Sequence, residues 1–189
     1  MIINPLLLES QVVKQILEDR ALLAVKAGGS AKAMLSTDGR SLGLAHEIFT
    51  LELSALTTSG QPPQPAGVRV LELKGETPVA FYDIADPRSG EVSQMSATSP
   101  YPQLFARALE MLADADGGEQ RFDLRLLRVP ALNFEALWLH ADEGDDDKLI
   151  PLRGFHGFTP MQPVSFRDAL ERLREPAHQA ARQDDTMGG

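Results

Sequence analysis

The sequence contains no cysteine, and this absence excludes disulfide bonds, thiolate metal sites and catalysis by a cysteine nucleophile. Basic residues are also few, because 18 lysines and arginines stand against 27 aspartates and glutamates and leave a net charge of −9. The densest basic stretch, Arg121, Arg125 and Arg128, alternates with apolar residues and is typical of a solvated strand face. An acidic protein without a basic run repels a polyanionic backbone, so we expect no nucleic-acid partner.

Long apolar runs are missing as well. No stretch approaches the roughly 20 apolar residues of a membrane-spanning helix, and residues 1–10 lack the basic start of a signal peptide. The chain of 189 residues, 43% of them hydrophobic, has ordinary globular composition. We therefore expect a soluble cytoplasmic protein with no membrane span, a single α+β domain over residues 1–176 and a flexible tail over residues 177–189.

Two helices are expected in the first part of the chain. Residues 5–27 carry apolar residues at helical spacing, and Pro5 suits a first helical turn, where its missing N–H is not needed. Ser99 belongs to the residue types that cap helix N-termini. The apolar stripe that follows it predicts a middle helix, which the polar residues 114–120 end.

The last predicted helix has the clearest local signature. Ser165 and Asp168 fit the Ser-x-x-Asp capping pattern. Apolar residues then recur at helical spacing and predict one face that packs on the sheet, through Phe166, Leu170 and Leu173. Pro176 is expected to stop this regular pattern, because proline lacks the N–H that a helix interior uses.

Alternation of apolar and polar residues predicts half-buried strands. It occurs in the segments 47–55, 68–73, 77–85, 121–139 and 148–152. Pro130 interrupts one of these segments, and we expect either two strands with a bend or one edge strand with a bulge there. Because helices and strands do not alternate as strict βαβ units, we predict an α+β fold with a mainly antiparallel sheet of about five to six strands.

An acidic loop follows the single tryptophan of the chain, Trp138. Residues 142–147 contain five acids, and a metal site, the rim of an active site and a solvated turn between strands are all open interpretations. An EF-hand loop needs Gly at its sixth position and Glu at its twelfth, and this loop has neither. We predict a solvated hairpin tip and neither a metal site nor a cofactor, and we leave open whether the loop binds a hard cation.

Three residues form the candidate catalytic centre. His140 and Asp142 are one residue apart, so a strand that reaches them places both on the side of Trp138. A His-x-Asp pair can bind a metal or position a general base. Two ligands are too few for a metal site, so a further group such as His156 has to come from elsewhere in the chain. The alternative is a surface histidine at the end of a strand.

A second candidate site is the loop of residues 151–163, which combines three prolines and two glycines with aromatic residues. Glycines let the backbone approach a ligand closely, and exposed aromatic side chains next to an arginine suit a peptide or an aromatic ligand. The candidate binding residues are Trp138, Arg153, Phe155 and Phe158. The alternative is a loop that the two phenylalanines hold on the core.

Two functions are consistent with these patterns. The first is a non-catalytic binding or assembly module, with a protein partner or a second copy favoured over a small molecule. The alternative is a small hydrolase or metal-assisted enzyme with a His/Asp centre. A homodimer is expected if the segment 121–139 leaves an uncovered apolar sheet edge, or if the loop around residues 155–158 holds a second copy.

Overall fold

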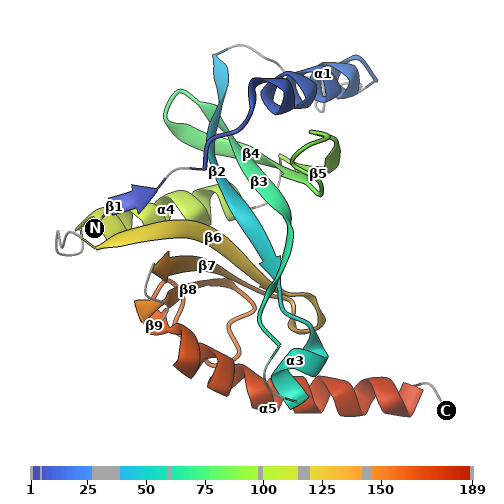
Figure 1. The fold of residues 1–189 in the computed structure, drawn as a ribbon, viewed down its shortest axis with the longest axis vertical. Helices are drawn as coiled ribbons and strands as arrows, with labels where there is room; N and C mark the ends of the chain where they lie inside the picture. The colour runs from blue at the N-terminus through green and yellow to red at the C-terminus, as the bar shows by residue number, and fades with distance from the viewer. Residues whose placement is uncertain are drawn as a thin grey trace. The chain divides into compact units, whose positions relative to one another are not determined.

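The structure is a computed structural model that describes residues 2–4, 6–26, 39–58, 61–97, 100–114, 120–141 and 146–187. The helices are α1 (Ser10–Lys26), α3 (Leu53–Thr58), α4 (Tyr101–Asp114) and α5 (Phe166–Met187), together with the 3-10 helix η1 (Pro130–Leu132). None of the helices in these ranges is long and apolar enough to cross a membrane. The strands are β1 (Ile2–Asn4), β2 (Arg40–Thr50), β3 (Gln64–Lys74), β4 (Thr77–Ile84), β5 (Val92–Ser96), β6 (Arg121–Val129), β7 (Phe134–Ala141), β8 (Lys148–Arg153) and β9 (Val164–Ser165) (Figure 1).

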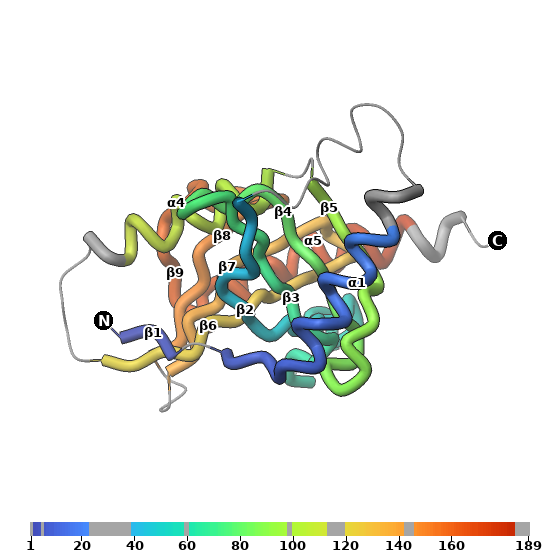
Figure 2. The backbone as a smooth tube through the Cα atoms, turned by 90° about the horizontal axis from the view of Figure 1, so that it is seen from above, coloured from blue at the N-terminus to red at the C-terminus, as the bar shows by residue number. Residues whose placement is uncertain are grey.

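The nine strands of the described residues hydrogen-bond in the order β5-β4-β3-β2-β6-β7-β8-β9, and β1 pairs with β6. The pairs β3–β4, β4–β5, β6–β7, β7–β8 and β8–β9 are antiparallel. β1 lies beside β6 and runs parallel to it (Figure 2). The mixed α+β architecture is confirmed, but the expected five to six strands are too few. The additional strands β1, β5 and β9 have three, five and two residues, and such short segments show too little alternation to be recognised.

The chain divides into two compact units. Unit 1 contains Met1–Asn4, Ile48–Ala66 and Ala108–Gly189, and unit 2 contains Pro5–Glu47 and Gly67–Arg107. The elements β2, β3 and α4 each contribute residues to both units. The single domain over residues 1–176 stays a prediction.

In unit 1, β6 and β7 form a hairpin around η1. Pro130 starts η1, and Asn133 ends it with a left-handed backbone (φ 50°), a conformation that asparagine tolerates better than most residues. The two strands then pair residue by residue along their whole length. Because β6 also pairs with β1 and β7 with β8, the predicted sheet edge in the segment 121–139 is wrong. The homodimer itself stays a prediction.

The end of β2 also differs from the sequence prediction. The alternation of residues 47–55 predicts one strand, whereas β2 ends at Thr50 and α3 begins three residues later. The last pairing contact of this region is the hydrogen bond from the N–H of Leu51 to the carbonyl of Arg128, at 2.8 Å. The chain then turns into α3, whose Leu56 is buried in the core of unit 1.

α5 covers the core of unit 1 with one stripe of side chains, which consists of Ala169, Leu173 and Ala177, all fully buried. All three residues of the predicted contact pack against this core: Leu173 is buried in it, and Phe166 and Leu170 are half-buried against it. Pro176 does not stop the helix, which runs on to Met187. Residues beyond the proline pack on the same core, and this packing outweighs the local preference to stop. The flexibility of residues 177–189 stays a prediction.

In unit 2, α1 packs against the hairpin of β3 and β4. Val12, Ile16 and Arg20 recur every four residues and form the buried stripe of α1. The core on this side consists of Val12, Ile16, Ala45, Val68, Val70, Tyr82 and Ile84. The helix begins at Ser10 rather than at residue 5, because Leu6 forms a β-bridge with Ala45.

Candidate functional site

Asp147, the last acid of the acidic loop, is a buried hydrogen-bond centre with 6% of its surface exposed. Its Oδ2 accepts a hydrogen bond from the indole N–H of Trp138 at 2.7 Å, and Oδ1 accepts one from the backbone N–H of Ala141 at 2.8 Å. Its own carbonyl accepts the N–H of Phe166, the first residue of α5, at 2.9 Å. Asp147 therefore connects β7 to the start of α5. Because it is buried, the predicted solvated hairpin tip is wrong for this residue. Residues 142–145 lie outside the described residues.

His140 is held by the same carboxylate. Its Nδ1 lies 2.9 Å from Oδ2 of Asp147, and an ionised carboxylate only accepts, so Nδ1 carries the proton of this bond. The imidazole side chain is 29% exposed, and in the neutral ring Nε2 then holds a lone pair. The predicted partner Asp142 lies outside the described residues. Asp147 supplies a carboxylate to His140 instead.

His156, the third predicted catalytic residue, lies at the other end of β7. Its Nε2 donates to the carbonyl of Leu132 at 2.6 Å, and its ring lies 6.4 Å from the ring of Phe134. Phe134 begins β7 and His140 comes six residues later, which corresponds to about 20 Å along a strand. The structure therefore does not bring His140 and His156 together.

The four predicted binding residues have different environments. Trp138 and Phe158 are core residues with 6% and 5% exposure, and Trp138 packs on Phe166 with a ring-centre distance of 4.9 Å. Phe155 is half-buried, and Arg153 is exposed and donates a hydrogen bond to the side chain of Asn133. Of the two phenylalanines in the loop of residues 151–163, Phe158 is therefore buried in the core and Phe155 is only partly covered.

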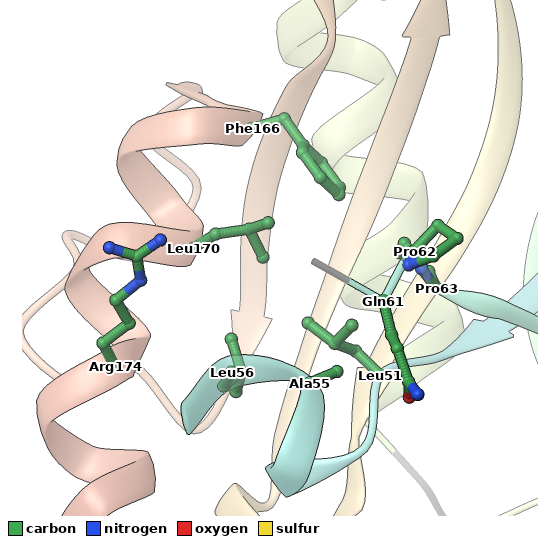
Figure 3. A pocket seen from close by; sticks show the side chains of 9 residues that line it. All are labelled: Leu51, Ala55, Leu56, Gln61, Pro62, Pro63, Phe166, Leu170 and Arg174. Carbon is green, nitrogen blue, oxygen red and sulfur yellow. The ribbon is translucent and has the colours of Figure 1, made fainter. Parts of the chain in front are cut away.

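A pocket of about 280 Å³ opens elsewhere in unit 1. It is lined by Leu51, Ala55, Leu56, Gln61, Pro62, Pro63, Phe166, Leu170 and Arg174. Phe166 and Leu170 extend from α5 toward the segment of the two prolines, while the α3 residues lie below them in the view (Figure 3). The pocket is therefore a mainly apolar space between α5, α3 and the residues that precede β3.

Arg174 is the one charged residue of the pocket lining. It follows Leu170 by one helical turn and is exposed. Within the part of the chain that the structure describes, no carboxylate forms an ion pair with it, in contrast to Arg182, which pairs with Glu175 on the same helix. The pocket can thus accept an apolar group and place a negative charge beside it.

Unit 2 buries an ion pair on one face of its hairpin. Arg69 donates to both carboxylate oxygens of Asp83, from Nε at 2.7 Å and from Nη2 at 2.8 Å. The guanidinium group lies over the rings of Phe81 and Tyr101, 3.9 and 4.2 Å from their centres. Such a bidentate and stacked arginine holds β3, β4 and the start of α4 together.

The other face of the same hairpin buries a second charged group, Glu72. Arg20 of α1 lies 2.6 Å from its Oε1, Arg40 lies 3.5 Å from Oε2, and the hydroxyl of Tyr82 donates to Oε2 at 2.8 Å. Burial, together with the hydrogen bond to Glu72, raises the pKa of Tyr82 far above its usual value. Tyr82 therefore stays a neutral donor, and Glu72 ties α1 and β2 to the hairpin.

His46 is fully buried in unit 2. Its Nε2 lies 2.9 Å from the hydroxyl of Tyr101, and its ring stacks on Phe105 at a centre distance of 4.7 Å. Burial, helped by the positive charge of Arg69, lowers the pKa of His46 to about 3, so the ring is neutral at pH 7. Among the described residues, none forms a hydrogen bond with its Nδ1.

The comparisons with known proteins add no functional information. No protein-family model, no curated protein and no solved structure matches the chain. Within the described ranges, no group of three or more histidine, aspartate or glutamate side chains is arranged to hold a metal ion. The geometry of the chain itself is therefore the basis for a functional proposal.

Sequence reasoning missed two of the residues that matter most here. Arg174 follows Phe166 and Leu170 at intervals of four residues, and that spacing was a visible signal of one helical stripe. The role of Asp147 had no such signal, because its partners depend on how β7, β8 and α5 pack. The charge run around it looks the same whether one of its acids is buried or not.

Proposed function

We propose that this protein is a non-catalytic binding module, whose unit 1 pocket holds an apolar side chain of a protein partner with a carboxylate of that partner beside Arg174. The observation that carries this proposal is that α5 contacts both the core and the pocket, through two neighbouring stripes of side chains. One stripe of the helix packs on the core, and the neighbouring stripe of Phe166, Leu170 and Arg174 lines the pocket. Phe166 and Leu170 stay half-buried and therefore have apolar surface left for a partner to cover.

The size of the pocket supports an anchor side chain rather than a complete small molecule. Small-molecule sites usually span about 300–1,000 Å³, and this pocket of about 280 Å³ lies at the lower end of that range. Protein interfaces often concentrate their binding energy in one or a few side chains that enter such pockets. A leucine-sized or phenyl-sized side chain is the occupant that we expect.

The apolar contact dominates the expected affinity, and Arg174 sets the preference among partners. Full burial of a leucine side chain contributes about 1.5–3 kcal/mol. An ion pair of an exposed arginine contributes about 0.2–1 kcal/mol. We therefore expect the loss of the apolar side chain to abolish measurable binding, and the loss of the carboxylate to weaken it by at most about fivefold.

Short synthetic peptides test the proposal directly. Each peptide of the set carries one leucine, phenylalanine or tryptophan two residues before a glutamate, and a matched set carries glutamine in place of the glutamate. Titration into the ¹⁵N-labelled protein should produce saturable shifts of the amide signals of Leu51, Leu170 and Arg174. The glutamate peptides should bind more tightly than their glutamine counterparts, by up to about fivefold.

Two pairs of variants provide the controls. Leu170→Lys should abolish binding, whereas Leu17→Lys, at a leucine of α1 that is 46% exposed, should leave it unchanged. Arg174→Gln should remove the preference for glutamate, whereas Arg182→Gln should keep it. If no peptide of the set gives saturable shifts at pocket residues up to millimolar concentration, the proposal is wrong.

One observation favours the alternative of a small hydrolase with a His/Asp centre. The carboxylate of Asp147 orients His140 and leaves its Nε2 free of that contact, which is the arrangement of a general base and its orienting acid. Hydrolysis of p-nitrophenyl acetate above the background rate, lost in His140→Gln and kept in His178→Gln, would support this alternative. A rate that His140→Gln leaves unchanged would contradict it.

A further inference from the structure

We infer that the protein partner is a second copy of this chain, and that Leu7 and Glu9 of this copy occupy the pocket and the space beside Arg174. This inference rests on the proposed function, because it names the occupant of the same pocket. Three observations carry it: the way in which Leu7 is presented, the spacing between Leu7 and Glu9, and the charges at both sites.

Leu7 is presented outward by its two neighbours. Leu6 and Leu8 pack against the core of unit 2, and Leu6 is tied to Ala45 by a β-bridge. Leu7 between them is 85% exposed, more than any other large hydrophobic residue in the described part of the chain. An exposed leucine held between two anchored residues loses little conformational freedom on binding, which favours association.

Glu9 follows Leu7 by two residues. Leu6 and Leu8 are half-buried and pack against the core of unit 2, whereas Leu7 and Glu9 are both exposed. Two residues of chain span at most about 7 Å. On the receiving surface, Leu170 and Arg174 are one helical turn apart, which is about 6 Å along the helix axis. A second copy with its Leu7 at Leu170 has enough chain length to bring its Glu9 to Arg174.

The charges of the two sites are complementary. Glu9 and Arg174 have no ion pair within the residues that the structure describes, whereas Glu175 and Glu18 are each paired with a basic residue of their own helix. A net charge of −9 makes two copies repel each other on average. A local contact between a free acid and a free base is thus needed to choose one orientation of approach.

Sedimentation equilibrium of the whole chain tests the inference. The wild-type chain should show a mass above 20.6 kDa that rises with concentration between 5 and 500 µM, toward a dimer or a longer head-to-tail assembly. Leu7→Ser should weaken the association at least about tenfold, because it removes the apolar anchor. The matched variant Leu22→Ser, at a leucine that is 54% exposed, should associate like the wild type.

A charge exchange identifies the contact itself. Glu9→Arg and Arg174→Glu should each weaken the association about tenfold or more, since each brings like charges together. The double variant Glu9→Arg/Arg174→Glu restores the pair with reversed sign and should return to within a few-fold of the wild type. A double variant as weak as either single variant overturns the inference, and so does a wild-type chain that is monomeric up to 500 µM.

A peptide of residues 4–10 separates this inference from the proposed function. If the short glutamate peptides bind the pocket while this peptide does not and the chain stays monomeric, the second copy is the wrong partner and the binding module stands. If no peptide reaches the pocket, both proposals are wrong. Binding of the 4–10 peptide that Arg174→Glu weakens, together with restored association in the double variant, supports both.

Discussion

Arg69 and Asp83 form an ion pair between neighbouring strands that contains two hydrogen bonds, and both side chains are almost completely buried. Removal of one partner leaves a buried charge without its counterpart, and we expect Arg69→Met to lower the free energy of unfolding by about 3–5 kcal/mol. The double variant Arg69→Met/Asp83→Leu should lose much less than the sum of the two single variants. Urea unfolding measures all three.

The control for this pair is Arg182→Met, which breaks an exposed ion pair with Glu175. Its effect should stay within about 0.5 kcal/mol, because exposed pairs contribute little. If the loss of unfolding free energy in the double variant equals the sum of the losses in the two single variants, the two charges are not coupled. That result would contradict the role that we assign to Arg69 and Asp83.

Asp147→Asn should destabilise the protein by about 2–4 kcal/mol, since the carboxylate accepts hydrogen bonds from three N–H groups and an amide presents only one acceptor oxygen. Asp146→Asn is the matched control, because Asp146 is an exposed neighbour in the same acidic run. The fluorescence of Trp138, which is bonded to Asp147, reports the unfolding in urea. If the two variants are equally stable, Asp147 behaves like a residue of a solvated turn and the buried role that we assign to it is wrong.

The two leucines of α5 should respond differently to truncation. Leu173 is fully buried, and Leu173→Ala should cost about 2–5 kcal/mol of unfolding free energy. The sequence pattern predicts a similar cost at Leu170, but this residue lines the pocket and is half-buried, so we expect Leu170→Ala to cost about 1 kcal/mol. Urea midpoints measured side by side separate the two, and a larger loss at Leu170 would contradict this division of the helix.

His46 should make the stability depend on pH. Its pKa is about 3 in the folded protein and about 6.5 in the unfolded chain, so the unfolded state binds more protons as the pH falls below 7. The free energy of unfolding should therefore drop by about 2 kcal/mol from this residue between pH 7 and pH 5. His46→Gln should remove that part of the slope, while His178→Gln, at an exposed histidine, should keep it.

Local patterns determined a good part of this protein. The composition alone shows that the chain has no cysteine and an excess of acids. The alternation in segments such as 77–85 predicts a strand where β4 lies. The Ser-x-x-Asp pattern correctly predicts the start of α5, where the N–H of Asp168 donates to the hydroxyl of Ser165 at 3.1 Å. These features are readable because their causes lie within one or two turns or one strand of the same segment.

Tertiary structure decided what depends on distant partners. β1 and β9 exist only through pairing with β6 and β8, and a segment of two or three residues has no periodicity of its own. Pro176 stays helical because residues beyond it pack on the core of unit 1. Asp147 is buried and Arg174 faces a pocket because of how α5 lies against β7 and α3, and the free energy of such packing appears only when the segments meet.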